Sequence, residues 1–348
     1  MDGNLVNRKM EQLKICLEND VEFRKKTTGF EKYEFIHNAL PEINLSDVDT
    51  CTQFLRRKIK FPFMISAMSG GFEEAERLNL MLVEAASELG IAMTVGSQRQ
   101  FIESGEFGES CRAIREKASG IPVVGNIGAA QLSLGIELKQ MEKALSMISA
   151  DAISVHLNPI QEVIQPEGQP FFRNVLREIN RLVKQLEIPV IVKETGGGIS
   201  AEVAQRLVDA GVAYIDVAGA GGTSWAGVEF YRIKGKGSSR EIAKKFWDWG
   251  IPTAECIKEV ASIPGARIIA SGGIKDGIDI AKSIALGASL SASARAVIRS
   301  LMKDGVEQLI KMLNQWKREL QIVMFLTGSR KVEDLRSGQK IRKMGDGR

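Results

Sequence analysis

The chain has 348 residues, 44% of them hydrophobic, which is enough for one large domain or two ordinary ones. The net charge is +4, and the segment 329–348 carries seven basic and three acidic side chains, so the rest is close to neutral and presents no broad basic face for nucleic acid. The first residues do not form a signal peptide and no run approaches the roughly 20 apolar residues of a membrane span, so we expect a cytoplasmic protein that binds neither nucleic acid nor membrane.

Short β-branched runs recur after residue 60, and each is followed by a helical pattern. The eight expected strands are Phe61–Met68, Ile91–Gly96, Pro122–Ile127, Ala152–Leu157, Pro189–Lys193, Tyr214–Val217, Ala266–Ala270 and Leu290–Ala294. Amphipathic stretches between them predict helices over 75–89, 138–148, 174–186, 201–210 and 278–286. Several of these stretches end at a glycine, where a left-handed helix cap belongs: Gly90, Gly211 and Gly287.

Alternating strands and helices predict a parallel sheet, and eight units in about 250 residues predict an α/β fold of the (β/α)8 TIM barrel type. A doubly wound open sheet is the alternative, but polar and glycine motifs follow almost every strand rather than one switch point. Residues 1–60 would form an N-terminal extension, 61–328 the barrel and 329–348 a basic C-terminal tail, which is most often solvated. The long segment Gly222–Gly250 is expected to be a lid or an interface loop.

The first three strands end in groups that suit a flat, charged ligand. Two glycines after strand one let the backbone approach a ligand without a Cβ clash. Arg99 can contact a phosphate through two hydrogen bonds or form a surface salt bridge, and Asn126 can read a ring edge or form a turn. The candidate residues at these strand ends are Ala67, Met68, Ser69, Ser97, Gln98, Arg99 and Asn126.

The stretch after the fourth strand, HLNPIQEVIQPEG at 156–168, is the most informative. Its two prolines and final glycine indicate a loop. The strand would therefore present His156, Asn158, Gln161 and Glu162 at one place. Such groups can orient a polar substrate, move a proton and hold a divalent cation. The alternative is a polar loop that satisfies its own backbone, but the clustering of polar groups beside a buried strand end favours function.

The last four strands lead to a lysine and to glycine-rich loops. Lys193, at the end of a buried strand, needs a partner, which is either an anionic ligand or Glu194. Barrels commonly bind a phosphate between the loops after strands seven and eight, where backbone N–H groups and a helix N-terminus converge; tight turns are the alternative. The candidates for that site are Thr223, Gly272, Gly273, Lys275, Ala294 and Arg295.

The 156–168 stretch resembles the signature of type II isopentenyl-diphosphate isomerase. That family depends on FMN and magnesium and interconverts isopentenyl and dimethylallyl diphosphate. Further motifs resemble those of the family, in the family's order, over nearly the whole chain. They are RK at 8–9, PFMISAMSGG at 62–71, GSQR at 96–99, KETG at 193–196, DVAGAGGTSW at 216–225, DWGIPT at 248–253 and SGGIKDG at 271–277.

The resemblance implies a role for each candidate. FMN would lie at the C-terminal rim of the barrel, held by Ala67, Met68, Ser69, Ser97, Asn126, Lys193, Thr223, Gly272, Gly273, Lys275, Ala294 and Arg295. The isoprenoid diphosphate would be bound by Arg8 and Lys9 of the extension and by Ser97, Gln98, Arg99, His156, Asn158 and Gln161. Mg2+ would sit on Glu162, and Gln161 and His156 would be catalytic beside FMN that NADPH reduces. Family members are tetramers or octamers, so a homo-oligomer is also implied.

Several positions depart from the family pattern. Gln12 stands where the family usually has His, Lys275 replaces the usual Arg, and Ala292 and Ala296 stand where Gly and Pro are common. Lysine keeps the charge of arginine but loses its bidentate fork, so these changes bear on substrate affinity more than on the fold. Glu229 resembles a residue that family members use near a subunit contact.

Three other functions compete with the isomerase. An FMN-dependent 2-hydroxy-acid oxidase needs a His base and an Arg after strand seven, and this chain has no histidine beyond residue 156. An inosine-monophosphate-dehydrogenase-like enzyme needs a cysteine after strand six, where Gly-Thr-Ser stands at 222–224. A flavoprotein that binds a nucleotide or a partner without isomerase activity is supported by the departures alone. The four cysteines are far apart, which fits no zinc site or disulfide framework but does fit a reducing cytosol.

Overall fold

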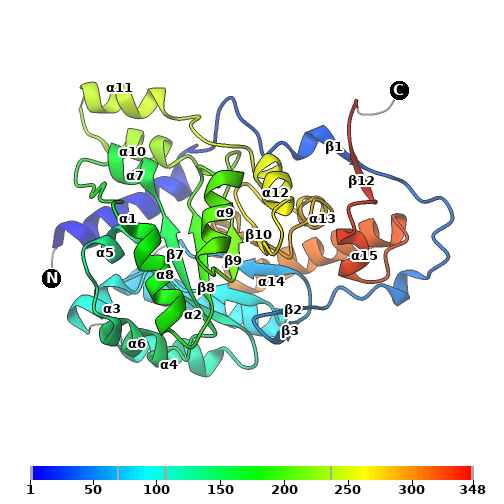
Figure 1. Ribbon diagram of the computed structural model, residues 1–348, viewed down its shortest axis with the longest axis horizontal. Coiled ribbons are helices and arrows are strands. Elements are labelled where there is room, and N and C mark those ends of the chain that lie inside the picture. Colours follow the sequence, from blue (N-terminus) through cyan, green and yellow to red (C-terminus); the bar gives the residue numbers. More distant parts are fainter. Residues whose placement is uncertain (1–2, 69, 106–107, 236, 346–348) are drawn as a thin grey trace.

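The computed structural model describes residues 3–68, 70–105, 108–235 and 237–345, so the predicted FMN residue Ser69 lies outside the described residues. Eight strands close into a parallel barrel at the centre of the molecule (Figure 1), in the order β10-β11-β4-β5-β6-β7-β8-β9. Their bounds are β4 Phe63–Ile65, β5 Ala92–Thr94, β6 Val123–Gly128, β7 Ala152–Leu157, β8 Val190–Glu194, β9 Tyr214–Asp216, β10 Ile268–Ala270 and β11 Leu290–Ser293. The predicted barrel is therefore confirmed, and the open sheet is excluded.

Side-chain alternation along the strands separates the two cores of the barrel. Along β7, Ile153 and Val155 pack in the layer between strands and helices, whereas Ala152 packs inside the barrel. Because successive side chains of a strand point to opposite faces, His156 shares the inward face of Ala152. The side chain of Lys193 on β8 points to the same inward face, because Lys193 is the register partner of His156.

The surrounding helices follow the predicted pattern. The helices predicted over 75–89, 138–148, 174–186, 201–210 and 278–286 are confirmed to within a residue or two, and Gly90 and Gly211 take the left-handed φ values of 63° and 84°. The last long helix, α14, is kinked at Gly305. The helices around the barrel are α2 Glu73–Leu89, α3 Arg99–Ser104, α4 Gly108–Lys117, α5 Ala129–Ser133, α6 Leu138–Met147, α8 Val175–Gln185, α9 Ala201–Asp209, α12 Thr253–Ala261, α13 Gly277–Ala285 and α14 Arg295–Leu326.

The N-terminal extension covers both ends of the barrel. A hairpin of β2 Thr52–Phe54 and β3 Arg57–Ile59 closes the amino end, where Phe54 meets Tyr214 edge-on with ring centroids 5.0 Å apart. The helix α1 Gly3–Glu18 lies at the opposite end, beside α7 Pro159–Ile164 and α10 Trp225–Arg232 (Figure 1). Apolar side chains fill the amino end, and a cavity opens at the carboxyl end.

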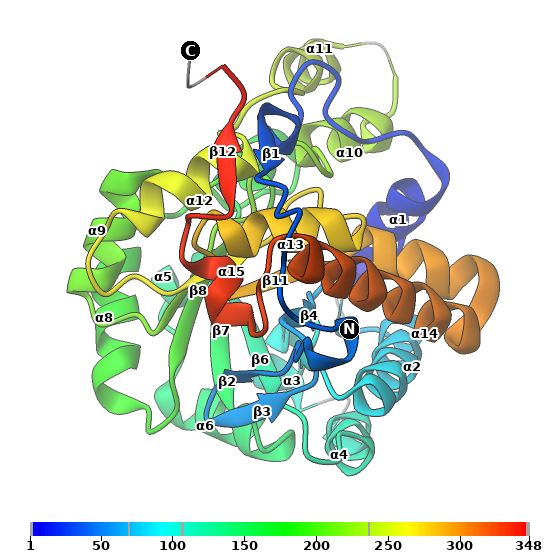
Figure 2. The same cartoon turned by 90° about the vertical axis from the view of Figure 1, so that its right-hand side faces the viewer.

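The C-terminal segment is part of the folded body rather than a solvated tail. It contains α15 Val332–Arg336 and β12 Ile341–Lys343, and β12 pairs antiparallel with β1 Tyr33–Phe35 (Figure 2). Val332 and Leu335 are buried against the barrel helices. Burial of these apolar side chains holds the segment on the barrel, although its overall composition is basic.

Two segments that were expected to be loops contain helices. The stretch after β7 forms α7 Pro159–Ile164, because proline is well suited to the first turn of a helix. The stretch Gly222–Gly250 contains α10 Trp225–Arg232 and α11 Ser238–Lys245. No helix in the described part of the chain is long and apolar enough to cross a membrane.

Candidate active site

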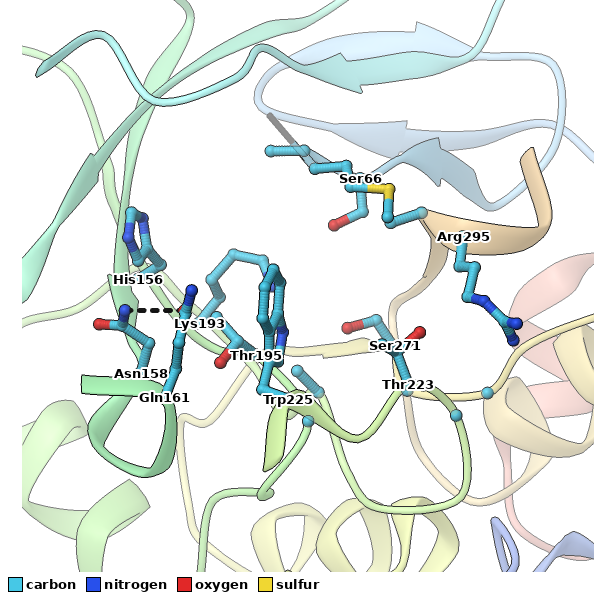
Figure 3. Close-up of a pocket in the computed structure, with 18 of the residues that line it drawn as sticks. Ser66, His156, Asn158, Gln161, Lys193, Thr195, Thr223, Trp225, Ser271 and Arg295 are labelled. Carbon is cyan, nitrogen blue, oxygen red and sulfur yellow. Dashed lines mark hydrogen bonds between the residues drawn. The ribbon is translucent and has the colours of Figure 1, made fainter. Parts of the chain in front are cut away.

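A cavity of about 660 Å³ opens at the carboxyl ends of the barrel strands, which is within the usual size range of small-molecule sites. The structure gathers here the described candidates from all eight strand ends and from α1. They are Arg8, Lys9, Ala67, Met68, Ser97, Arg99, Asn126, His156, Asn158, Gln161, Glu162, Lys193, Thr223, Gly272, Gly273, Lys275, Ala294 and Arg295. Figure 3 shows His156, Asn158 and Gln161 on one side of this space and Thr223, Ser271 and Arg295 on the other.

Gln98 is the described candidate that does not line this cavity. Its side chain is buried and its Nε2 donates to the carbonyl of Ala144 at 2.9 Å. It therefore ties the end of β5 to α6 and lies behind the cavity wall. Its neighbours Ser97 and Arg99 do line the cavity, on either side of this first position of the turn into α3.

The first turn of α7 arranges two polar side chains around Asn158. The Nδ2 of Asn158 donates to Gln161 Oε1 at 3.0 Å and to Glu162 Oε1 at 2.9 Å (Figure 3). The Oδ1 of Asn158 is buried and has no hydrogen-bond partner among the described residues. A buried amide oxygen without a donor is costly, so this atom points to a missing ligand donor or cation.

Glu162 is the one acidic candidate for a metal. Its second oxygen accepts from Gln165 Nε2 at 2.8 Å and from the backbone N–H of Gln169 at 2.7 Å. No group of three or more His, Cys, Asp or Glu side chains within the described ranges is placed to hold a metal. Mg2+, which commonly binds through one or two carboxylates plus substrate phosphates, fits such an oxygen-donor site, whereas a metal that needs an all-protein cage does not.

His156 is held as a neutral imidazole. Its Nδ1 lies 3.0 Å from Asn126 Oδ1, and because that oxygen only accepts, the proton is on Nδ1 and Nε2 is free to accept. Burial, with smaller contributions from the nearby Lys193 and Lys9, lowers the pKa of His156 to about 3. His156 is therefore a weak candidate for a general acid at pH 7.

Three cations meet beside the polar groups of α7. Lys9 donates to the carbonyl of Gly70 at 2.6 Å, and burial together with Arg99 and Arg8 lowers the pKa of Lys9 to about 8. Burial also lowers the pKa of Arg8, whose Nε has no partner among the described residues. Arg99 is paired with Glu103 at 2.7 Å. Cations that repel one another in a partly desolvated place form a site that an anion stabilises.

The far side of the cavity is built from closely packed glycine loops. A Cβ at Gly222 would come within 2.5 Å of the backbone N of Gly273, and one at Gly221 within 2.2 Å of the backbone N of Thr28. The backbone therefore lines the cavity next to the N-terminus of α13. Together with the buried Lys193 and the unpartnered Oγ1 of Thr195, this wall fits a flat mononucleotide with a phosphate.

Arg295, which was expected to contact a phosphate, binds residues at the end of α1 instead. Its Nε donates to the carbonyl of Cys16 at 2.9 Å, and its terminal nitrogens bind the carbonyl of Asn19 and Glu22 at 3.1 and 2.6 Å. It therefore caps the C-terminal end of α1, where a cation is favourable. Lys275, two residues after Gly273, is exposed at the rim of the cavity.

The sequence did not indicate the contacts that link α1 to α10. Gln12 donates to Glu229 Oε1 at 2.7 Å, and Arg232 donates to Glu229 Oε2 at 2.7 Å. Arg232 also contacts Glu167 at 2.6 Å. Glu229, which was expected near a subunit contact, is thus buried and paired within its own chain. A spacing of more than 200 residues leaves no local signal for such a pair.

A segment of the extension, residues 22–28, was also missed as part of the site. Glu22 bridges to Thr223, and the backbone N–H of Ala254 donates to the carbonyl of Thr28 at 2.9 Å. The side chains of Glu22, Lys26 and Thr28 line the cavity. The segment carries no motif, and only its position over the glycine loops identifies it.

Comparisons with known proteins agree with this geometry. The family described as FMN-dependent dehydrogenase matches residues 2–103 and 131–342. An isopentenyl-diphosphate delta-isomerase of Pelodictyon phaeoclathratiforme is 45% identical, over 98% of each chain. Proteins of the same name from Metallosphaera sedula and Pyrococcus furiosus are 45% and 44% identical, over 96% and 95% of this chain and 91% and 85% of the relatives.

Solved structures of mandelate oxidase share the fold. One, with a monooxide FMN adduct, has a TM-score of 0.63 at 19% identity, over 96% of this chain and 92% of the other. Another, with (S)-2-phenylpropionate, has a TM-score of 0.64 at 18% identity, over 97% and 98% of the two chains. At this identity the similarity concerns the fold alone.

Proposed function

Because the chain belongs to the FMN-dependent dehydrogenase family and, within it, to the isopentenyl-diphosphate delta-isomerases, we propose that it interconverts isopentenyl and dimethylallyl diphosphate with reduced FMN and Mg2+. One arrangement carries the proposal. The cations Arg8, Lys9 and Arg99 and the polar groups of α7 line one cavity at the rim of the barrel. A small molecule with a charged head and an apolar tail matches that arrangement.

The charged head of the substrate would lie against the cationic side. Lys9 and Arg8 are poorly solvated and repel each other, so a diphosphate relieves that repulsion. Glu162 would hold Mg2+, which would neutralise part of the charge of the diphosphate, and the Oδ1 of Asn158, without a partner among the described residues, lies on the same turn. In this proposal the hydrocarbon end of the substrate would lie deeper, toward His156 and the barrel.

Moving the double bond requires a proton added to C4 and a proton removed from C2, and an unactivated alkene is a very weak base. No side chain at the reacting end is a strong acid, since His156 is neutral and Gln161 does not titrate. Reduced FMN, when bound, supplies the acid–base chemistry that these side chains lack. Asn158 fixes the amide of Gln161 by hydrogen bonding, and that amide then orients the substrate carbons. The cavity walls exclude water from the developing charge.

We also propose a reductant for the flavin, an oligomeric assembly and a cellular location for the protein. NADPH is the reductant that we propose, and a homo-oligomer, a tetramer or an octamer, is the assembly. Four free thiols in the described residues support a reducing, cytoplasmic location.

The rival oxidase lacks its catalytic groups in this chain. A 2-hydroxy-acid oxidase needs a histidine base and an arginine after strand seven, where this chain has Ser271 to Lys275. The second histidine of the chain, His37, is exposed in the extension. The departure at Gln12 gives little support to a non-isomerising flavoprotein, since Gln12 keeps a close contact with Glu229.

The test is an isomerisation assay on the purified chain with FMN and Mg2+. We expect conversion when NADPH or dithionite reduces the flavin and little conversion with oxidised FMN, because only the reduced flavin would supply the acid–base group that the side chains lack. Oxidation of 2-hydroxy acids without isomerisation would replace the proposal by the oxidase. Arg99→Gln, with the exposed Arg177→Gln as a matched control, separates a specific loss of diphosphate affinity from a general effect of charge.

A further inference from the structure

Lys193 and Asp216 form a buried ion pair inside the barrel. They are register partners on the neighbouring strands β8 and β9, so both side chains point to the same face. The Nζ of Lys193 lies 3.9 Å from Oδ2 of Asp216. Lys193 is 7% exposed and Asp216 is 1% exposed. Water therefore does little to screen this pair.

The surroundings make Asp216 the counter-ion of Lys193. Glu194, its sequence neighbour, directs its carboxylate at the backbone N–H groups of residues 195 and 196, at 2.6 and 2.5 Å. Its carbonyl, not its carboxylate, accepts from Lys193 Nζ at 2.6 Å. Lys193 is therefore not paired with the Glu194 carboxylate, which was the alternative partner expected from the sequence.

Asp216 is held in place from the other side. Ser271 Oγ donates to Asp216 Oδ1 at 2.5 Å, whereas Oδ2 has no hydrogen-bond partner among the described residues. Burial raises the pKa of Asp216, and Lys193 opposes that rise. Lys193 and Ser271 line the cavity and Asp216 lies behind them. A ligand in the cavity therefore meets the charge of Asp216 through Lys193.

We propose that Asp216 is a positioning residue that holds Lys193 against the flavin and sets how much positive charge the flavin meets. The inference rests on the proposed binding of FMN at this rim. A lysine next to the flavin ring favours the reduced form, which carries negative charge, and a carboxylate behind that lysine reduces this preference. Asp216 thus tunes the ratio of affinities for reduced and oxidised FMN without touching either.

The test is Asp216→Asn, with dissociation constants measured for oxidised and for reduced FMN. We expect the ratio of affinities to shift by about tenfold toward reduced FMN, since one buried charge is removed. For a two-electron couple this corresponds to a midpoint potential roughly 30 mV higher. Lys193→Met should shift the potential in the opposite direction, and Asp216→Glu, which keeps the charge, should stay close to the parent. Asp209→Asn, an exposed aspartate on α9, is the matched control.

The outcomes separate this inference from the proposed function. Failure of the parent chain to bind any FMN would overturn the proposed function itself. Binding of FMN with a potential that Asp216→Asn leaves unchanged or lowers would overturn the inference alone. If Asp216→Asn does not fold, Ser271→Ala takes its place: the hydrogen bond from Ser271 lowers the pKa of Asp216, so its removal favours the neutral carboxyl and acts in the same direction. A smaller shift in the same direction then supports the inference, and no shift refutes it.

Discussion

The surroundings of Lys9 favour the loss of its proton. Burial, Arg99 and Arg8 together bring the pKa of Lys9 to about 8 in the free protein. Lys9 is therefore charged below pH 8 and loses its charge as the pH rises through that value. We expect kcat/KM for isopentenyl diphosphate to fall above about pH 8, because kcat/KM reports ionisations of the free enzyme. Lys9→Arg should move this limb beyond the measurable range, since guanidinium stays protonated; an unchanged limb would assign it elsewhere.

Glu162 is expected to carry the Mg2+ requirement. Glu162→Gln keeps an oxygen and the contact with Asn158 but removes the charge that a divalent cation needs. We expect the Mg2+ concentration for half-maximal activity to rise at least about tenfold, which is a loss of roughly 1.4 kcal/mol, while FMN stays bound. Glu167→Gln, on the same segment but paired with Arg232, is the control. An identical Mg2+ dependence in both variants would remove Glu162 from the metal site.

Gln161 is expected to act on turnover more than on binding. Gln161→Asn shortens the side chain that Asn158 holds, so the amide no longer reaches the reacting carbons. We expect kcat to fall by roughly 10²-fold with KM changed by less than about threefold, which is the signature of an interaction made mainly in the transition state. Steady-state kinetics measure both. A rise in KM at constant kcat would instead make Gln161 a simple binding residue.

At the scale of elements, α1 is the part that completes the site, and Arg295 fastens it. The contacts of Arg295 with Cys16, Asn19 and Glu22 fix the C-terminal end of α1, whose first half carries Arg8 and Lys9.

Arg295→Gln should therefore raise KM for the diphosphate by about tenfold and speed amide hydrogen exchange in α1, with FMN affinity nearly unchanged. Titration with FMN and hydrogen exchange measure the two effects. Arg318→Gln, at an exposed position of α14 away from the cavity, is the control. If Arg295→Gln instead loses FMN affinity and hydrogen exchange in α1 is unchanged, Arg295 contacts the FMN phosphate, as the sequence predicted.

At the scale of the whole molecule, the C-terminal segment belongs to the same cooperative unit as the barrel. Leu335 is fully buried, and β12 pairs with β1 across some 300 residues of sequence. Leu335→Ala should therefore lower the free energy of unfolding by about 3 kcal/mol and shift the single melting transition as a whole. Thermal unfolding checks this, with the exposed Lys343→Ala as the control. A transition that stays in place would mean that the segment frays independently of the barrel.

The sequence by itself determined the barrel and most of the site. Strand and helix periodicities are local properties of the chain, and so is the order of polar groups at the strand ends. A parallel barrel brings all its strand ends to one rim, so His156, Asn126 and Lys193 had to converge once the fold was identified. The 156–168 motif added the polar groups of α7 in the same way.

Only the tertiary structure decided which partner each polar group has. Gln98 lies behind the cavity wall, and Arg295 binds the C-terminal end of α1. Lys193 pairs with Asp216 rather than with the carboxylate of Glu194. The basic C-terminal segment also folds onto the barrel. These choices depend on distances between residues far apart in the chain and on the cost of leaving a buried charge unpaired, and neither leaves a periodic signal in the sequence.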